Sequence, residues 1–294
     1  MRVTDHRLVD MSTAATQKNQ AKVAELADET STGMRVGKPS DDPVAWLTAQ
    51  RAHVRQTLSD GAGKAVDSGH DRLVATDGAL SQLSDILSRV RVLAVQGAND
   101  TLSAGDRTSL GVEARALFTS AVGAANSRAG DGEYLLAGTN SLAQPFDATT
   151  GAYTGDAVTN SVTTDQTTTQ VATIAGTSLT AANGVDVLPL LDRLATAFAA
   201  NDLTTIRASF DDLEKATAQV SSTRSHTGAM MSVLEQAKTA QGELATRLST
   251  TISDAVEADT VTAASELAKA TQALEVSRAV STHIISMLGP TSTQ

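Results

Sequence analysis

Residues 31–43 read STGMRVGKPSDDP and separate a short N-terminal segment with helical spacing from a much longer one. Gly33 loosens the backbone, and Pro39 and Pro43 each disfavour helix at the residue before them. Asp42 is placed to cap a new helix, because Pro43 then takes the first helical position, where its missing N–H has no helical partner to lose. The stretch therefore predicts a corner that ends one helix and begins the next.

The segment after the corner has the spacing of a coiled-coil seam. Residues at alternating steps of three and four run through Leu73, Thr76, Leu80, Leu83, Leu87, Val90 and Ala94. Gly97 closes this helix, and Ser103 begins the next, with Asp106 in its first turn. We therefore predict rod helices over 43–128 and, where the spacing returns, helices over 187–254.

The two ends of the chain carry thinner stripes. The last segment steps 4,3,4,3,4,3,4 from Ala263 to Leu288, but half of its positions are alanine or serine, which bury little apolar area. An isolated helix of this kind is marginal, so each terminal helix should be ordered only against the other end of the chain or a neighbour in an assembly. The predicted assembly seam comprises Leu8, Met11, Val23, Leu26, Ala263, Leu267, Ala270, Leu274, Ile284 and Leu288.

The composition changes between Ala129 and Asp192, where the chain has no lysine, arginine or histidine and threonine is frequent. Neighbouring β-branched residues with interspersed glycines suit short strands and turns. We predict a β-rich module over 129–186, with a short strand at Tyr134–Leu136. One buried face is expected from Val158, Val162, Val171 and Ile174. A threonine-rich linker is the alternative.

The charge and cysteine content narrow the function classes. The 294 residues include 23 Lys and Arg against 33 Asp and Glu, a net charge of −10, which disfavours a nucleic-acid partner because phosphate binding needs a basic face. The chain has no cysteine, so disulfides, thiolate metal sites and cysteine nucleophiles are excluded. Its five histidines are scattered without metal-ligand spacing, so we predict no catalytic residue, cofactor or metal site.

The sequence shows neither a membrane span nor a secretion signal. No stretch is apolar and long enough to predict a transmembrane helix, so no membrane partner is expected. The N-terminal residues are too polar to supply the apolar middle of a cleavable signal peptide. Taken alone, these features predict a cytoplasmic protein.

The corner at 31–43 resembles that of the flagellin family. Flagellins usually carry Ser-Ser-Gly and Lys-Asp-Asp-Ala here, and the Ser-Thr-Gly and Pro-Ser-Asp-Asp-Pro of this chain are more similar to the short family members at the hook–filament junction. The family corner comprises Gly33, Pro39, Ser40, Asp41, Asp42 and Pro43.

Further segments resemble the same branch of the family. Residues 130–146 read GDGEYLLAGTNSLAQPF, with Leu136 in place of the usual phenylalanine, and residues 153–156 read Tyr-Thr-Gly-Asp. The tail SELAKATQALEVSRAV at 265–280 also fits, whereas residues 157–184 match nothing in the family.

The spacing and the resemblance together predict a mainly α fold. We expect an elongated antiparallel helical bundle or coiled-coil rod with a small β-rich module inserted mid-chain. The expected parts are an N-terminal helix and corner at 1–42, rod helices at 43–128, the β-rich module at 129–186, returning helices at 187–254 and a C-terminal assembly helix at 255–294.

The resemblance implies a structural adaptor, not an enzyme, that joins the hook of a bacterial flagellum to its filament. It implies an extracellular location, reached through the flagellar type III export apparatus with an uncleaved N-terminus. The implied partners are hook-associated protein 1, flagellin, a flagellar export chaperone and further copies of the chain in a ring. The alternatives are a flagellin, the filament subunit itself, and a helical cytoplasmic signalling module.

Overall fold

The computed structural model describes residues 2–164 and 168–288, with side chains described from 6 to 164 and from 168 to 287. Its elements, in chain order, are α1 (Arg2–Thr32), α2 (Pro43–Gly97), α3 (Ala104–Ala125), β1 (Ser161–Thr163), β2 (Thr169–Val171), the 3-10 helices η1 (Gly176–Leu179) and η2 (Ala181–Asn183), α4 (Val187–Ala199), α5 (Leu203–Val256) and α6 (Thr260–Leu288). The predicted class is confirmed: the fold is mainly α, with one small antiparallel sheet mid-chain.

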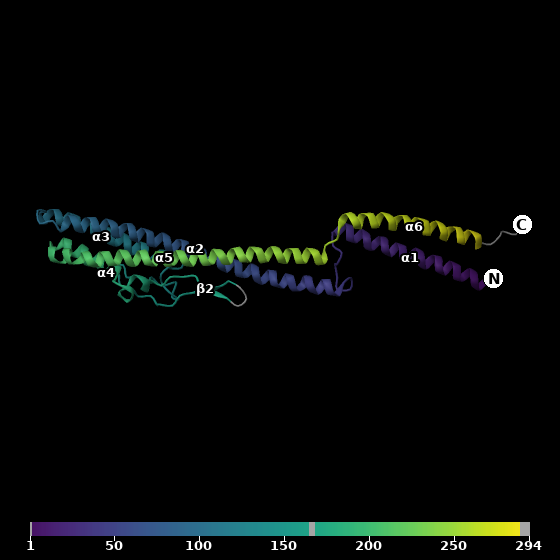
Figure 1. Ribbon diagram of the computed structural model, residues 1–294, viewed down its shortest axis with the longest axis horizontal. Coiled ribbons are helices and arrows are strands. Elements are labelled where there is room, and N and C mark those ends of the chain that lie inside the picture. The colour runs from purple at the N-terminus through teal and green to yellow at the C-terminus, as the bar shows by residue number, and fades with distance from the viewer. Residues whose placement is uncertain (1, 165–167, 289–294) are drawn as a thin grey trace. The chain divides into compact units, whose positions relative to one another are not determined.

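The described chain forms two compact units. Unit 1 comprises the described residues up to 57 and from 245 onward, and unit 2 comprises those between 58 and 244. The long helices α2 and α5 contribute to both units. In unit 1, α1 and α6 lie side by side, with the start of α1 and the end of α6 at the same end of the pair (Figure 1).

Unit 2 holds one continuous apolar core built from α2, α3, α4, α5 and the module. The predicted α2 seam is confirmed, because Leu73, Thr76, Leu80, Leu83, Leu87, Val90 and Ala94 are all buried. The predicted break is confirmed as well: α2 ends at Gly97, and Ser103 caps α3 by accepting a hydrogen bond from the Asp106 N–H at 3.2 Å.

Within unit 2, α2 and α5 run antiparallel. Asp67 of α2 pairs with Lys238 of α5 at 2.9 Å, and Asp77, ten residues further along α2, pairs with Arg224 at 2.9 Å. Residue numbers therefore increase along α2 in the direction in which they decrease along α5. Both ion pairs are partly exposed to solvent beside the buried leucines, so they contribute little stability and mainly fix the register of the two helices.

The β-rich module is confirmed, and the linker alternative is not. β1 and β2 pair antiparallel with Val162 opposite Gln170, and Ala172 and Ile174 beyond β2 join the core of unit 2. These apolar side chains pack in the core and hold the module in place, whereas a linker has no such packing.

Two details of the predicted module are wrong. Val158 and Val171 are both exposed. Val171 follows Gln170, the residue that pairs with Val162, so it points to the opposite face of the sheet from Val162. In place of the strand expected at Tyr134–Leu136, Tyr134 forms an isolated β-bridge with Arg128, and a turn follows at Leu135 and Leu136. The strand does not continue because the N–H groups of Tyr134 and Leu135 donate to carbonyls of different segments, those of Ser141 and Ser127.

Two segments quoted from the sequence meet inside the module. Gly138 has a φ of 75°, in the left-handed region, and an added Cβ there would lie 2.0 Å from the Asp156 carboxylate. That carboxylate accepts a hydrogen bond from the Thr139 N–H at 3.0 Å, and the Tyr153 hydroxyl donates to the Leu136 carbonyl at 3.1 Å. The segments 134–139 and 153–156 therefore form one compact turn structure.

Candidate functional site

The corner at 33–43 is a closed turn between two helices. Gly33 ends α1 with a φ of 70°, and its N–H donates to the Glu29 carbonyl at 2.9 Å, as in an αL helix end. The predicted cap is confirmed: Asp42 Oδ1 accepts the N–H groups of Val44 and Ala45 at 3.1 and 3.0 Å, and α2 begins at Pro43.

The other residues of the family corner complete the turn. Asp41 Oδ2 accepts hydrogen bonds from the N–H groups of Gly37 and Lys38 at 3.2 and 3.1 Å. Pro39 and Ser40 are exposed at its outer edge. The two adjacent aspartates thus hold two different sets of backbone amides, which explains both without acid–base chemistry.

The corner is also bonded to the α5–α6 junction, a contact that the sequence did not reveal. The N–H groups of Arg35 and Val36 donate to the Val256 carbonyl at 2.8 and 3.2 Å, and the Ala258 N–H donates to the Gly33 carbonyl at 2.8 Å. Val36 is buried there, at 2% exposure. Since these partners are more than 200 residues apart, no local signal could identify them.

The α5–α6 junction is capped in the same way as the corner. Asp259 Oδ1 accepts the N–H groups of Val261 and Thr262 at 3.0 and 3.2 Å. A hydrogen bond from the Thr262 hydroxyl, together with these two backbone hydrogen bonds, lowers the pKa of Asp259 below its ordinary value of 3.8. The Ala45 N–H likewise lowers the pKa of Asp42. Both caps are therefore ionised at neutral pH.

The face between α1 and α6 is rich in hydroxyl groups. Thr16 Oγ1 lies 3.0 Å from Ser277 Oγ and 3.4 Å from Ser281 Oγ, and Ser12 Oγ also pairs with Ser281. One turn further along α1, Asn19 Nδ2 donates to the Ala273 carbonyl at 3.4 Å. Small side chains let the two backbones approach closely, but they bury little apolar area.

The structure brings together most of the predicted seam. Leu26, Ala263 and Leu274 are buried, and Val23, Leu267, Ala270 and Ile284 are half-buried. Leu8 and Met11 lie outside this face, at 52% and 73% exposure. Leu288 ends α6, and its side chain lies outside the described residues.

The predicted seam missed four of the α1 residues that face α6, which are Val9, Ser12, Thr16 and Asn19. With the predicted Val23 and Leu26, these residues form a half-buried or buried stripe at steps of 3,4,3,4,3. This spacing is more regular than that of the Leu8 stripe, but three of its members are polar. A search for apolar residues alone therefore selects the neighbouring face.

Each helix of the pair carries a second stripe, one residue before the first. On α1 the second stripe contains Leu8 and Met11, and on α6 it contains Val276, Val280 and Met287. All five side chains are at least half exposed. We call these five residues the outer stripes. Exposed apolar residues at helical spacing are typical of a surface that packs on another helix.

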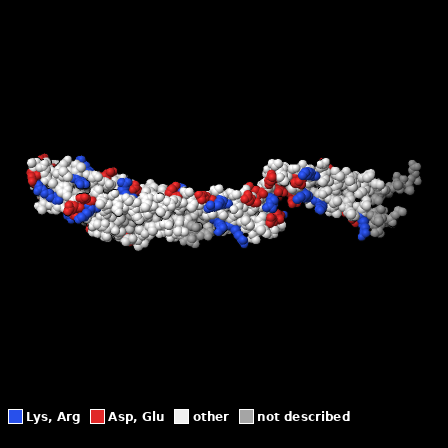
Figure 2. Space-filling model, in the orientation of Figure 1, with Lys and Arg blue, Asp and Glu red and all other residues white. Residues whose placement is uncertain are grey.

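The surface charge is mixed. On the face shown in Figure 2, blue and red atoms are interspersed, and no extended blue area is visible. Among the described residues, no group of three or more His, Asp or Glu is arranged to hold a metal ion. No helix among the same residues is long and apolar enough to cross a membrane.

Comparisons with known proteins point to one family. Residues 8–141 match the bacterial flagellin N-terminal helical region. The chain is 30% identical over 155 residues to flagellar hook-associated protein 3 of Salmonella typhimurium, covering 53% of this chain and 49% of the relative. It is 35% identical over 91 residues to a flagellin of Listeria monocytogenes, covering 31% and 32% of the two chains. The chain thus spans about half the length, or less, of these curated relatives.

The fold has a counterpart among solved structures. A putative flagellar hook-associated protein from Vibrio parahaemolyticus superposes with a TM-score of 0.66 at 20% identity, over 74% of this chain and all of that one. The match to hook-associated protein 3 is also longer than the match to flagellin. The chain is similar to proteins of the flagellin family, and its similarity to flagellar hook-associated protein 3 extends over a longer stretch than its similarity to flagellin.

Proposed function

We propose that this chain is the structural adaptor between the hook and the filament of a bacterial flagellum. The observation that carries the proposal is the pair α1 and α6, which meet through a thin hydroxyl-rich face and leave the outer stripes exposed. Leu8, Met11, Val276, Val280 and Met287 are available to neighbouring subunits, and their burial would supply the stabilisation that the internal face lacks.

The proposal includes specific partners. Hook-associated protein 1 contacts the chain on the hook side, flagellin contacts it on the filament side, and further copies of the chain form a ring. A flagellar export chaperone covers α6 before secretion through the type III channel, with the N-terminus uncleaved. A terminal helix pair with little internal stabilisation suits this route, since it costs little to open and folds again when partners cover it.

Deletion of the gene tests the proposal. Cells without the chain should build hooks and shed unassembled flagellin into the medium, and a plasmid copy should restore filaments. Shed flagellin is measured by immunoblot of the medium, and hooks are counted by electron microscopy. Normal filaments in the deletion strain would contradict the adaptor role. Growth of long filaments from the purified chain alone would identify it as a flagellin instead.

A pair of variants tests whether assembly requires α6 to pack on α1. Leu267→Asp with Leu274→Asp places two carboxylates on the α1-facing side of α6, where burying a charge is costly. Incorporation between hook and filament should fail, while unit 2 stays helical by circular dichroism. The matched control is Ala264→Asp with Thr271→Asp, which has the same spacing on exposed positions of α6. If the Leu variant still supports motility, assembly does not require α6 to pack on α1.

A further inference from the structure

Two of the five residues in the outer stripes are methionines. Met11 of α1 and Met287 of α6 are each 73% exposed, more than Leu8, Val276 or Val280 in the same stripes. Most of each methionine is therefore open to reagents dissolved in water.

Methionine differs in reactivity from the other residues of the outer stripes. Leucine and valine side chains contain only carbon and hydrogen and do not react with mild oxidants. The methionine sulfur takes one oxygen atom from hydrogen peroxide: the O–O bond breaks, an S–O bond forms, the sulfur loses two electrons and water leaves. The product, methionine sulfoxide, is polar where the thioether was apolar. Hydrogen peroxide would thus make two apolar positions of the outer stripes polar.

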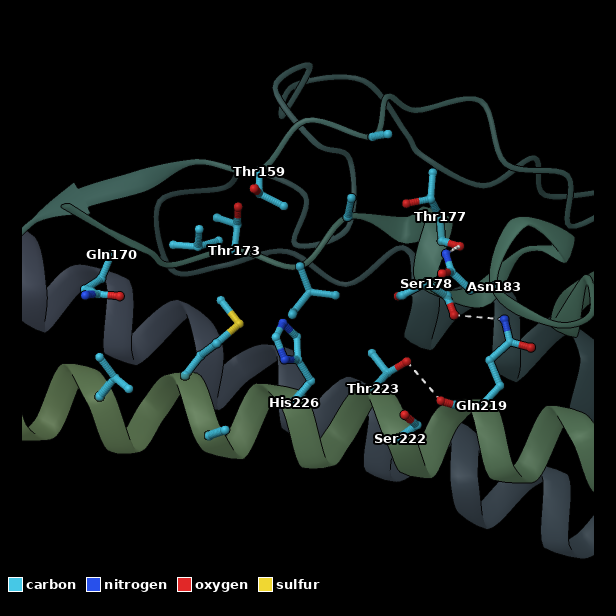
Figure 3. A pocket seen from close by; sticks show the side chains of 17 residues that line it. Thr159, Gln170, Thr173, Thr177, Ser178, Asn183, Gln219, Ser222, Thr223 and His226 are labelled. Atoms are coloured by element: carbon cyan, nitrogen blue, oxygen red, sulfur yellow. Dashed lines mark hydrogen bonds between the residues drawn. The ribbon is translucent and has the colours of Figure 1, made fainter.

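The remaining described methionines lie elsewhere. Met34 is 51% exposed but belongs to the corner, outside the outer stripes. Met230 and Met231 of α5 are half-buried and pack against the core of unit 2. Met230 also lines an open pocket between α5 and the stretch of the module that carries Thr173 and Ser178 (Figure 3). Because susceptibility to oxidation follows exposure, Met230 and Met231 should react more slowly than the outer-stripe methionines.

A sulfoxide in the outer stripes opposes packing against a neighbouring subunit. Leu8, Val276 and Val280 have no side-chain donor for the sulfoxide oxygen, and burying a polar group without a hydrogen-bond partner costs free energy. A neighbour that already covers the stripes also keeps the oxidant away from both sulfurs. The free chain is therefore the sensitive form, and oxidation acts before assembly.

We propose that Met11 and Met287 are oxidation sites, and that their sulfoxides block assembly of the chain until they are reduced. In the reduction, the thiols of a methionine sulfoxide reductase supply two electrons and the oxygen leaves as water. The inference rests on the proposed adaptor function, since it takes the outer stripes as the surface that neighbouring subunits cover.

Peptide mass spectrometry of the full chain, after graded treatment with hydrogen peroxide, tests the reactivity. Met11 and Met287 should be converted to the sulfoxide several-fold faster than Met230 and Met231, at doses that leave the helical circular dichroism unchanged. Conversion of Met230 and Met231 at an equal or higher rate overturns the proposal.

A filament-growth assay tests the consequence for assembly. Hooks isolated from the deletion strain receive the purified chain and then flagellin, and filaments are counted by electron microscopy. Peroxide-treated chain should support about tenfold fewer filaments than untreated chain, and methionine sulfoxide reductases should restore them. Equal numbers for treated and untreated chain overturn the oxidation proposal alone. If the untreated chain supports no filaments, the adaptor function is wrong and this proposal falls with it.

Two variants assign the effect to the outer stripes. Met11→Leu with Met287→Leu keeps apolar side chains of similar volume that peroxide does not oxidise. Met34→Leu is the matched control, because Met34 is exposed outside the stripes. Each variant is compared with its own untreated sample, so any effect of the substitution itself cancels.

Peroxide should leave the filament number of the double variant unchanged and should lower that of Met34→Leu as much as that of the unsubstituted chain. Loss of filaments in the treated double variant would place the sensitive group outside the outer stripes and overturn the proposal. Protection of the chain by Met34→Leu would overturn it as well.

Discussion

The seams of α2 in unit 2 and of α6 in unit 1 share the same spacing of three and four but differ in burial. On α2, Leu73, Leu80, Leu83 and Leu87 are fully buried, whereas on α6 Leu274 is 8% exposed and its neighbouring seam residues are mostly half-buried. The α2 seam joins a core that several elements share, and α6 packs on α1 through serine, alanine and threonine. Spacing thus identifies the buried face, while side-chain size and the number of surrounding elements decide how much it stabilises.

The largest expected effect of this difference is on local opening. Amides of α1 and α6 should exchange with solvent at least roughly 1000-fold faster than those of residues 73–94, because local opening of a thinly packed pair costs little free energy. Hydrogen exchange followed by mass spectrometry measures this, and limited proteolysis should cut residues 6–30 and 260–287 first. If amides of α1 and α6 exchanged as slowly as those of residues 73–94 in the dilute monomer, the two seams would not differ in stability and the prediction would be wrong.

Truncating one leucine in each seam compares their packing directly. Leu83→Ala should lower the free energy of unfolding of unit 2 by about 3 kcal/mol, through lost burial and the cavity left behind. Leu274→Ala should cost the α1/α6 pair roughly half as much, since its surroundings collapse more easily. Native-state hydrogen exchange reports both values in one experiment. A larger cost at Leu274 would mean that the terminal pair is the better packed region.

Removing the hydroxyl groups between α1 and α6 should change the stability of the pair by less than the Leu→Ala substitutions do, and in the stabilising direction. Replacing Ser12, Thr16, Ser277 and Ser281 together by Ala, Val, Ala and Ala removes both partners of each hydroxyl contact. Such a change is neutral or stabilising, by up to about 1 kcal/mol, because the hydroxyls regain water when the pair opens. Ser281→Ala alone should destabilise the pair by leaving Ser12 unpartnered. We expect hydrogen exchange in α1 to be slower in the fourfold variant and faster in the Ser281→Ala variant.

The smallest effect is the response to acid. The Ala45 N–H holds the pKa of Asp42 below the ordinary 3.8, and the Thr262 hydroxyl, with the Thr262 and Val261 N–H groups, does the same for the pKa of Asp259. Protons therefore bind the unfolded chain first as the pH falls. The stability that these caps contribute is present above pH 4 and is lost as the pH drops through their folded pKa values. The melting temperature should therefore be flat from pH 7 to 5 and decline below about pH 4.

Asn variants provide the control for the acid response. Asp42→Asn with Asp259→Asn keeps a capping oxygen at both positions but cannot titrate. In this variant, the part of the decline that comes from these two caps should disappear, measured as hydrogen exchange in α1 and α6 against pH. An unchanged decline would assign the acid response to other carboxylates, such as Asp147, Asp156 and Asp202 in unit 2, whose pKa values are also lowered.

Much of the fold was predictable because its causes are local. The α2 seam, the break at Gly97, the Ser103 cap and the Asp42 cap each depend on residues within a few positions of one another. The β-rich module was predictable from its threonine and glycine content, but its buried face was not. The strands are three residues long, and only their pairing decides that Val162 points inward while Val171 points out.

By itself, the sequence determined the corner at 33–43, the break after Gly97 with its Ser103 cap, and which face of the strong α2 seam is buried, since caps and large leucines act over one or two turns. Only the tertiary structure decided the rest. It chose the face of α1 with Ser12 and Thr16 over the face with Leu8 and Met11, because small residues on both helices allow a close approach. It also joined Gly33 and Arg35 to residues 256–258, and it opened a pocket beside Ser178. Contacts between residues so distant in the chain depend on where whole helices lie, which no local pattern encodes.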